Sequence, residues 1–250
     1  MPRRDIAFKA SDRVTLRGWF FTPSSSSGKL PCLVMAPGIS SNLPVTVLAY
    51  DNRCIGASDG EPRREIIPSL QLSDCSDAIT FAQTLPESRS HVLTVSDVDR
   101  RVKAVINQVP LISGWETFHR VHRSAFIPGL NKLFQNGQLL SSCKGEEPGR
   151  LPVVDKDPHA LSVLPSEGSF VGYSSGLRSG WINDVTLKRL EAFRAYEPVA
   201  FIEHISPTPL LMEPKQWHLL TARHFDPYDG HLYGENVSIQ IKFLEDRLLK

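Results

Sequence analysis

The sequence lacks the features of a membrane protein, a secreted protein and a nucleic-acid-binding protein. No run of about 18 apolar residues occurs, and residues 1–13 hold no apolar core of signal-peptide length. The formal net charge is only +1, which gives no basic field for nucleic acid or for an anionic membrane. We therefore expect a cytoplasmic protein with no nucleic-acid partner and no membrane partner.

Metal-binding and disulfide patterns are also missing. The four cysteines are widely spaced without a C-x-x-C pair, which favours free thiols in a reducing compartment. The eight histidines show no H-x-x-x-H or H-E-x-x-H spacing. His119 and His122 are three residues apart on a predicted helix, and we expect them on its solvated face. The sequence predicts no metal site and no cofactor.

What is present is the composition of an ordinary globular protein. Hydrophobic residues make up 41% of the 250 residues and charged residues 22%. A chain of this length is one large domain or two small ones, with enough residues to bury a substantial core. The 19 prolines and 16 glycines indicate many loops.

The apolar pattern predicts an α/β fold with buried central strands. Continuous apolar runs of this kind are typical of strands covered on both faces, as in a parallel sheet. The predicted strands are 5–9, 14–22, 30–36, 45–50, 102–110, 209–212 and 217–221, the first two forming a hairpin, and the predicted helices are 70–85, 115–126, 129–140, 185–196 and 235–249. In the first helix Asp74 and Asp77 are expected on the face opposite the apolar one. Residues 1–110 are expected to form the N-terminal half of a core, 111–198 an inserted helical cap, and 199–250 the C-terminal part of the core.

Two junctions are too short for this fold. Parallel neighbours need a crossover of a dozen or more residues, usually a helix. The strands 30–36 and 45–50 are separated by eight residues, and the strands 209–212 and 217–221 by four. Each pair is therefore either antiparallel or has lost a crossover.

Three stretches resemble a known family. The loop YDNRCIGASDGEPRREI (50–66) resembles the D-x-R-x-x-G-x-S-x-G loop of α/β-hydrolases, and DRRVKAVINQVPLISGWETF (99–118) and LKRLEAFRAYEPVAFIEHISPTPLLM (187–212) are more specific. Together they resemble fungal polyketide transferases and thiohydrolases, with dienelactone-hydrolase-like and Xaa-Pro-peptidase-like hydrolases as broader relatives. The resemblance implies an α/β-hydrolase fold, a mostly parallel sheet with helices on both faces and an inserted helical cap, here incomplete.

The resemblance also implies a Ser–Asp–His triad and an oxyanion hole. The triad histidine maps onto His224, and the oxyanion donor maps onto the backbone N–H of Ile39. The nucleophile elbow has no counterpart: residues 91–105 resemble the helix after the elbow, so the strand and turn before His91 are expected to be missing. The acid loop is reduced to Glu213-Pro214.

Weaker candidates remain for the missing groups. Gly172 to Gly176 spells G-x-S-x-G, but it falls in a Gly/Ser-rich part of the cap, where a flexible loop is the expected role of Ser174. Ser90 lies near the lost elbow without glycines to form the turn. Asp51 and Asp59 are expected to cap turns and to pair with Arg53 or Arg63, and Asp226 is a weak replacement for the lost acid.

Two functions follow from these observations. The first is a serine-type thiohydrolase or acyltransferase that acts on a polyketide thioester or ester, delivered by a polyketide synthase carrier domain, in fungal mycotoxin-type secondary metabolism. The second is a catalytically inactive, truncated or mis-spliced member of that family. The lost crossovers also predict poor solubility or a low thermal midpoint, because they leave sheet edges unpaired.

Overall fold

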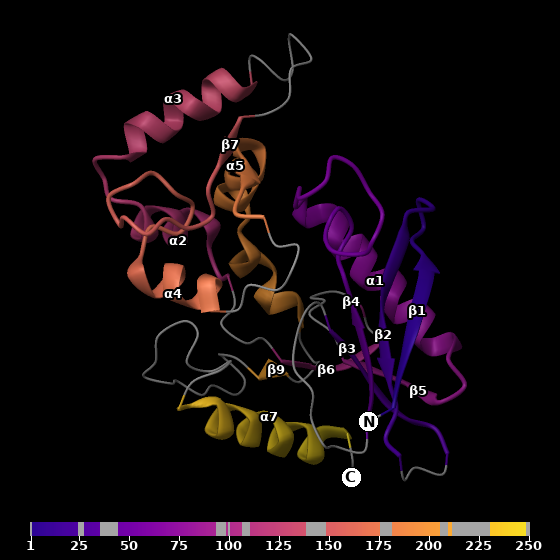
Figure 1. The fold of residues 1–250 in the computed structure, drawn as a ribbon. Helices are drawn as coiled ribbons and strands as arrows, with labels where there is room; N and C mark the ends of the chain where they lie inside the picture. The colour runs from indigo at the N-terminus through magenta and orange to yellow at the C-terminus, as the bar shows by residue number, and fades with distance from the viewer. Residues whose placement is uncertain are drawn as a thin grey trace.

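The fold is a seven-stranded mixed sheet with helices on both faces and a helical segment beside it (Figure 1). The computed structural model describes residues 2–24, 28–35, 45–93, 99, 101–106, 111–138, 149–175, 182–205, 210–211 and 231–248, with the backbone alone at 88–93, 175, 202–205 and 210–211. The strands in chain order are β1 (Arg3–Lys9), β2 (Thr15–Phe21), β3 (Leu30–Met35), β4 (Thr46–Tyr50), β5 (Ser88–Leu93), β6 (Val102–Ile106) and β9 (Leu210–Leu211). Their spatial order is β1-β2-β4-β3-β5-β6-β9.

The predicted hairpin forms the antiparallel end of the sheet. β1 pairs with β2 in the register Ala7 to Arg17, and β2 pairs with β4 in the register Gly18 to Tyr50. Gly18 is needed there, because a Cβ atom on it would lie 2.1 Å from the Ala49 carbonyl oxygen. The hairpin therefore packs closely against the first parallel strand.

The other strands are parallel to one another. The sequence left open whether the strands 30–36 and 45–50 are antiparallel, and the structure shows that they are not. β3 pairs in parallel with β4 and with β5, and β6 pairs in parallel with β5 and with β9. The predicted strands 30–36, 45–50, 102–110 and 209–212 are thus confirmed apart from their ends. The connection 36–44 and the predicted strand 217–221 lie outside the described residues.

The expectation for residues 91–105 was wrong. Ser88–Leu93 is a strand, not the start of a helix, and it lies between β3 and β6 with Val92 paired to both Cys32 and Val102. Only Val92 and Leu93 of this stretch favour a strand by themselves, so the pairing with β3 and β6 decides its conformation. Only the eight residues 94–101 separate β5 from its parallel neighbour β6.

Two helices cover the two faces of the sheet. α1 (Pro68–Thr84) packs Cys75, Ala78, Ile79 and Ala82 against one face, together with Leu48 of β4. α7 (Tyr233–Leu248) packs Phe243 and Leu244 against the other face, which includes Val47. Leu48 and Val47 point to opposite faces because successive side chains alternate along a strand.

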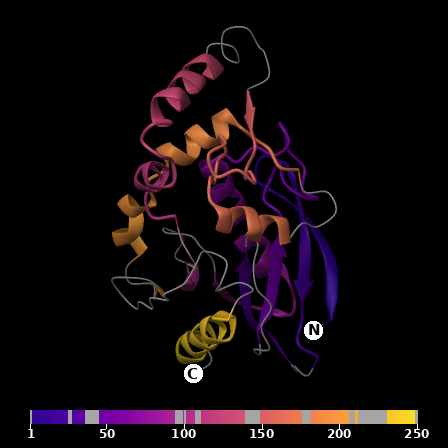
Figure 2. The same ribbon diagram turned by 60° about the vertical axis from the view of Figure 1, so that its left-hand side comes forward.

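The segment between β6 and β9 forms a helical cap beside the sheet (Figures 1 and 2). Its elements are α2 (Gly114–Val121), α3 (Ile127–Gln138), β7 (Arg150–Leu151), α4 (Glu167–Ser175), β8 (Val185–Thr186), α5 (Leu187–Ala195) and the 3-10 helix η2 (Pro198–Ile205). Ser113 and Thr186 cap α2 and α5 by accepting backbone N–H bonds. Phe118, Leu130 and Leu190 form a core within the cap that is separate from the cores under the sheet.

No helix in the described part of the chain is long and apolar enough to cross a membrane.

Candidate functional site

A cavity of about 310 Å³ lies between the sheet and the cap. Its walls come from the carboxyl end of β4, the start of α1, the segment after β6 and the end of α5. The lining residues are Tyr50, Asn52, Ile66, Pro68, Gln71, Leu72, Cys75, Leu111, Arg189, Phe193 and Tyr196. Ligands of open α/β sheets bind at the carboxyl ends of the strands, and this volume is at the low end for small-molecule sites. The cavity is therefore the candidate site.

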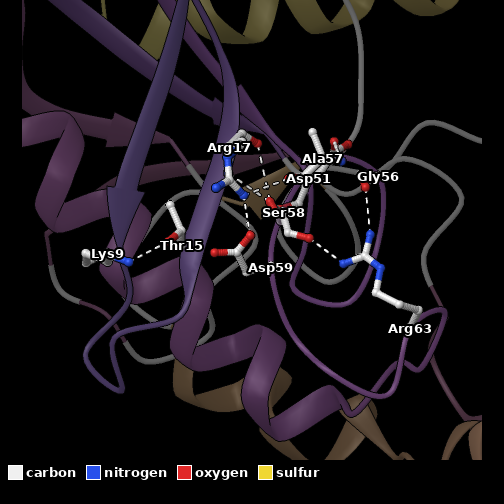
Figure 3. A network of polar contacts seen from close by, with 9 residues as sticks. All are labelled: Lys9, Thr15, Arg17, Asp51, Gly56, Ala57, Ser58, Asp59 and Arg63. Atoms are coloured by element: carbon white, nitrogen blue, oxygen red, sulfur yellow. Dashed lines mark hydrogen bonds and ion pairs between the residues drawn. The ribbon is translucent and has the colours of Figure 1, made fainter.

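The loop after β4 is held in shape by its own polar groups (Figure 3). Asp51 accepts a hydrogen bond from the Ala57 N–H at 2.8 Å, and its carbonyl oxygen accepts one from Ser58 Oγ at 2.6 Å. Arg63 Nη2 donates to the Gly56 carbonyl oxygen at 2.7 Å. The predicted turn-capping role of Asp51 is confirmed, whereas its predicted pairing with Arg53 or Arg63 is not seen among the described residues.

Arg17 of β2 fastens this loop to the hairpin (Figure 3). Its backbone N–H donates to Ser58 Oγ at 2.8 Å, and its guanidinium donates to the Ala57 carbonyl oxygen at 2.9 Å and to the Asp59 carboxylate. The hydrogen bond from Arg17 lowers the pKa of Asp59. The predicted partner of Asp59 was wrong, because Arg63 is occupied by backbone carbonyls and Arg53 points elsewhere.

A buried ion pair joins the loop to α1. Arg53 Nε lies 2.8 Å from Asp74 Oδ2, and Arg53 Nη1 lies 2.6 Å from Asp12 Oδ2. The hydrogen bond from Arg53 also lowers the pKa of Asp12. Asp74 is 0% exposed, so its expected place opposite the buried face of the helix was wrong. The helix turns this carboxylate inward because Arg53 neutralises it there. Asn52 and the start of α1 are thereby held at the cavity.

The cap side of the cavity is attached through α5. Arg64 Nη1 lies 2.7 Å from Asp184 Oδ1 just before β8. Lys188 Nζ lies 3.3 Å from Glu65 Oε1, an ion pair without hydrogen-bond geometry. The Gly114 N–H donates to the Tyr196 carbonyl oxygen at 2.8 Å. These contacts place the end of α5 opposite α1.

The residues predicted to carry catalysis are only partly placed. His224, Ile39, Asp226 and the Glu213-Pro214 turn lie outside the described residues. Ser90 lies within β5, where the structure gives its backbone alone. The roles of His224 and Ile39 therefore stay predictions.

Ser174 does not lie in a nucleophile elbow. It is a half-buried residue of α4, not part of a loop as expected. An elbow needs a strand directly before the serine and a helix directly after it, whereas Ser174 lies near the end of its helix. The G-x-S-x-G motif at Gly172 to Gly176 therefore lacks the strand–turn–helix geometry of a nucleophile elbow.

The two histidines of α2 have different surroundings. His119 contacts the Trp115 ring at 4.2 Å between centroids and is half-buried, so its expected place on a solvated face holds only in part. The same expectation was wrong for His122, which is only 2% exposed, with Nδ1 3.0 Å from the Phe118 carbonyl oxygen and Nε2 3.3 Å from the Ser162 carbonyl oxygen; the neutral ring donates to one of the two. Burial lowers the pKa of His122. Among the described residues no group of three or more His, Cys, Asp or Glu is placed to hold a metal ion.

Sequence reasoning missed the polar lining of the cavity. Arg189 and Phe193 both line it from α5, and their spacing of four residues places them on one helix face. That spacing was visible in the sequence, but nothing in the sequence paired this face with Tyr50 and Gln71. Sequence reasoning also passed over Ser96, the first serine after the strand that the structure shows at 88–93.

Comparison with known proteins identifies the family. The polyketide transferase grgF of Penicillium sp is 30% identical over 241 residues, which cover 85% of this chain and 78% of grgF. The thiohydrolase of Eupenicillium brefeldianum is 27% identical, with 98% of this chain and 94% of that protein covered. The crystal structure of the α/β-hydrolase GrgF from Penicillium sp. sh18 superposes with a TM-score of 0.77 at 25% identity, covering 100% of both chains. No protein-family model matches the chain. The chain belongs to the family of fungal α/β-hydrolases that includes polyketide transferases and thiohydrolases.

The relatives contain internal positions that this chain lacks. The polyketide transferase af380 of Aspergillus fumigatus is 28% identical over 300 residues, and the alignment covers 99% of both chains. Since this chain has 250 residues, about 50 positions of that alignment have no counterpart in it. The difference agrees with a chain whose strand connections are short.

Proposed function

We propose that the chain is a thiohydrolase or acyltransferase that acts on a polyketide thioester or ester in fungal secondary metabolism. The names of its relatives support the substrate class. The observation that carries the proposal is the cavity, which combines apolar walls from Ile66, Leu72 and Phe193 with a few polar groups at the carboxyl edge of the sheet. Such a lining suits an acyl chain with oxygen substituents.

The proposed chemistry is acyl transfer through a serine. His224 takes the proton of the serine hydroxyl, the serine oxygen attacks the acyl carbonyl carbon, and the backbone N–H of Ile39 stabilises the oxyanion. The carbon–sulfur or carbon–oxygen bond then breaks, and the leaving thiol or alcohol receives the proton from His224. Water or an acceptor alcohol releases the acyl group from the serine. The proposed nucleophile is Ser96, the first serine after β5 in the sequence, which lies outside the described residues.

The substrate is proposed to arrive on the carrier domain of a polyketide synthase in the cytoplasm. The test compares an acyl N-acetylcysteamine thioester with the same acyl group on a carrier domain. Faster release from the carrier domain supports this partner, and equal rates for both would show that the chain does not recognise it.

The spacing of β5 and β6 favours a second candidate function, a catalytically inactive family member. An elbow requires a turn and a helix between these parallel strands, and residues 94–101 are fewer than the dozen needed for a crossover. Such a protein binds the acyl compound without forming an acyl-enzyme.

Labelling with a fluorophosphonate probe separates the two functions. The first function predicts that the folded protein is labelled, that labelling is lost in S96A, and that it persists in the control S174A. It also predicts much slower labelling in H224A. A folded protein that the probe leaves unlabelled rejects the first function and supports the second. The genomic DNA beside the short junctions is a further check, because in-frame coding for an elbow there would show that the chain derives from a mis-spliced message.

A further inference from the structure

The cavity between α1 and α5 carries buried hydrogen-bond donors without a strong acceptor. Nε2 of Gln71 has no hydrogen-bond partner in the described part of the chain, and the hydroxyl of Tyr50 has only the Cys75 thiol beside it, a weak acceptor. Tyr50 itself is only 3% exposed. A buried donor without an acceptor costs about 1–3 kcal/mol, so an oxygen acceptor entering this wall would be stabilised there.

Arg189 adds an unneutralised positive charge to the same wall. Among the described residues its guanidinium donates a long 3.4 Å bond to the Arg64 carbonyl oxygen, and no carboxylate pairs with it. Two carboxylates that hold the cap pair with other cations, Glu65 with Lys188 and Asp184 with Arg64. Burial lowers the pKa of Arg189, and the charge interaction with Tyr173 offsets this only in part.

The described lining favours an anionic ligand over a cationic one. None of the described lining residues is an aspartate or a glutamate, and the buried Asp74 on α1 is neutralised by Arg53. Burial, with the Cys75 thiol beside it, raises the pKa of Tyr50, so its phenol stays protonated and remains a donor. The polar groups therefore present donors and one positive charge, while the rest of the wall is mainly apolar.

We propose that this cavity binds the carboxylate of an acyl compound, with Arg189, Tyr50 and Gln71 as its hydrogen-bond donors and the apolar wall around its chain. The acyl nature of the ligand rests on the proposed function, whereas its negative charge follows from the donors alone. Arg189 would hold the carboxylate through its paired N–H groups, the geometry in which guanidinium binds this group most strongly. The chain is thus a receptor for an acidic acyl compound, either as substrate or as released product.

Calorimetric titration with octanoate and with 1-octanol, which has the same chain length without the charge, tests the proposal. Octanoate is expected to bind at least about tenfold more tightly than 1-octanol and to raise the thermal midpoint. R189Q should abolish this preference, and Y50F should weaken octanoate binding several-fold. R120Q is the matched control, since Arg120 is 80% exposed on α2, and it should bind octanoate like the unmodified chain. Equal affinity for the two probes, or unchanged octanoate binding by R189Q, overturns the proposal.

Further measurements separate loss of the carboxylate site from loss of folding and from loss of catalysis. R189K retains the charge and should retain the preference for octanoate; if R189Q does not fold, loss of the preference in R189K overturns the proposal. Without ligand, R189Q should have a thermal midpoint no lower than that of the unmodified chain, because it removes a half-buried charge that no carboxylate of the described residues neutralises. Fluorophosphonate labelling reports on the nucleophile alone. A chain that labels but does not prefer octanoate rejects only the carboxylate site, and a chain that prefers octanoate but does not label rejects only the catalytic function.

Discussion

Arg53 and Asp74 form an ion pair in the interior, with Arg53 Nε 2.8 Å from Asp74 Oδ2. Arg53 is 6% exposed and Asp74 is 0% exposed. One residue belongs to the loop after β4 and the other to α1, so the pair fixes the distance between two walls of the cavity. Its removal should affect both stability and ligand binding.

Replacing Asp74 should destabilise the protein strongly. D74A leaves the Arg53 guanidinium buried with only the half-exposed Asp12 as its partner, and breaking a buried pair costs about 3–5 kcal/mol. Urea denaturation measures the change in the free energy of unfolding. D5A is the control, because Asp5 is 79% exposed and its ion pair with Arg3 is long at 3.8 Å, so its loss should cost less than about 1 kcal/mol. A D74A variant as stable as D5A would contradict the structural role of the pair.

Removing both charges should cost less than removing one. R53M/D74L replaces the pair with apolar side chains and leaves no unpaired charge in the interior, which in other proteins is close to neutral. We expect R53M/D74L to be more stable than D74A in the same urea titration. A double variant less stable than D74A would show that the hydrogen bonds of Arg53 matter more than its charge.

Gly114 is expected to be intolerant of a side chain. A Cβ atom there would lie 2.0 Å from the Phe193 carbonyl oxygen and 2.6 Å from the Tyr196 carbonyl oxygen, so G114A must push α2 away from the end of α5. Overpacking of this kind costs about 1–3 kcal/mol. G129A is the matched control: nothing lies within 4 Å of a Cβ at Gly129 in α3, and alanine should stabilise that helix by about 0.5–1 kcal/mol. The thermal midpoint of G114A should therefore be lower than that of the unmodified chain, and the midpoint of G129A should be higher.

His122 should make stability depend on pH in a narrow range. Burial lowers its pKa in the folded state from the ordinary value of 6.5, so below about pH 6.5 the unfolded chain binds a proton that the folded chain does not. Stability should fall as the pH falls through this range and level off once the folded state is also protonated. Urea midpoints measured from pH 7.5 downwards check the slope. H122N should reduce it, and an unchanged slope in H122N would assign the effect to another group.

The whole chain is expected to have a low thermal midpoint or poor solubility. Two pairs of parallel neighbours are joined by the segments 36–45 and 94–101, which are shorter than an ordinary crossover, and lost crossovers favour association through unpaired sheet edges. Scanning calorimetry and size-exclusion chromatography measure both properties. A sharp cooperative melt of a monomer at the midpoint of an ordinary mesophilic domain would contradict the expectation.

The strands with continuous apolar runs could be read from the sequence, and β5 could not. Runs such as Val45 to Tyr50 are buried on both faces, and that burial is a local property of the sequence. Ser88–Leu93 contains an arginine and a histidine, and its pairing with β3 and β6 overrides its weak local pattern. The burial of Asp74 could not be predicted either. The apolar periodicity places it on the solvent side of the helix, and only its contact with Arg53 shows why it is buried.

By itself the sequence determined the fold class, the family and the shortness of the connections, because apolar periodicity, matched motifs and chain length are properties of the chain alone. Only the tertiary structure decided that the strands around the short connections are parallel, that Ser174 lies in a helix, and which side chains meet in the cavity. Tyr50, Gln71 and Arg189 are far apart in the chain, and folding brings all three to the wall of one cavity. The physical reason is that burial and pairing depend on contacts between distant segments, which no local pattern specifies.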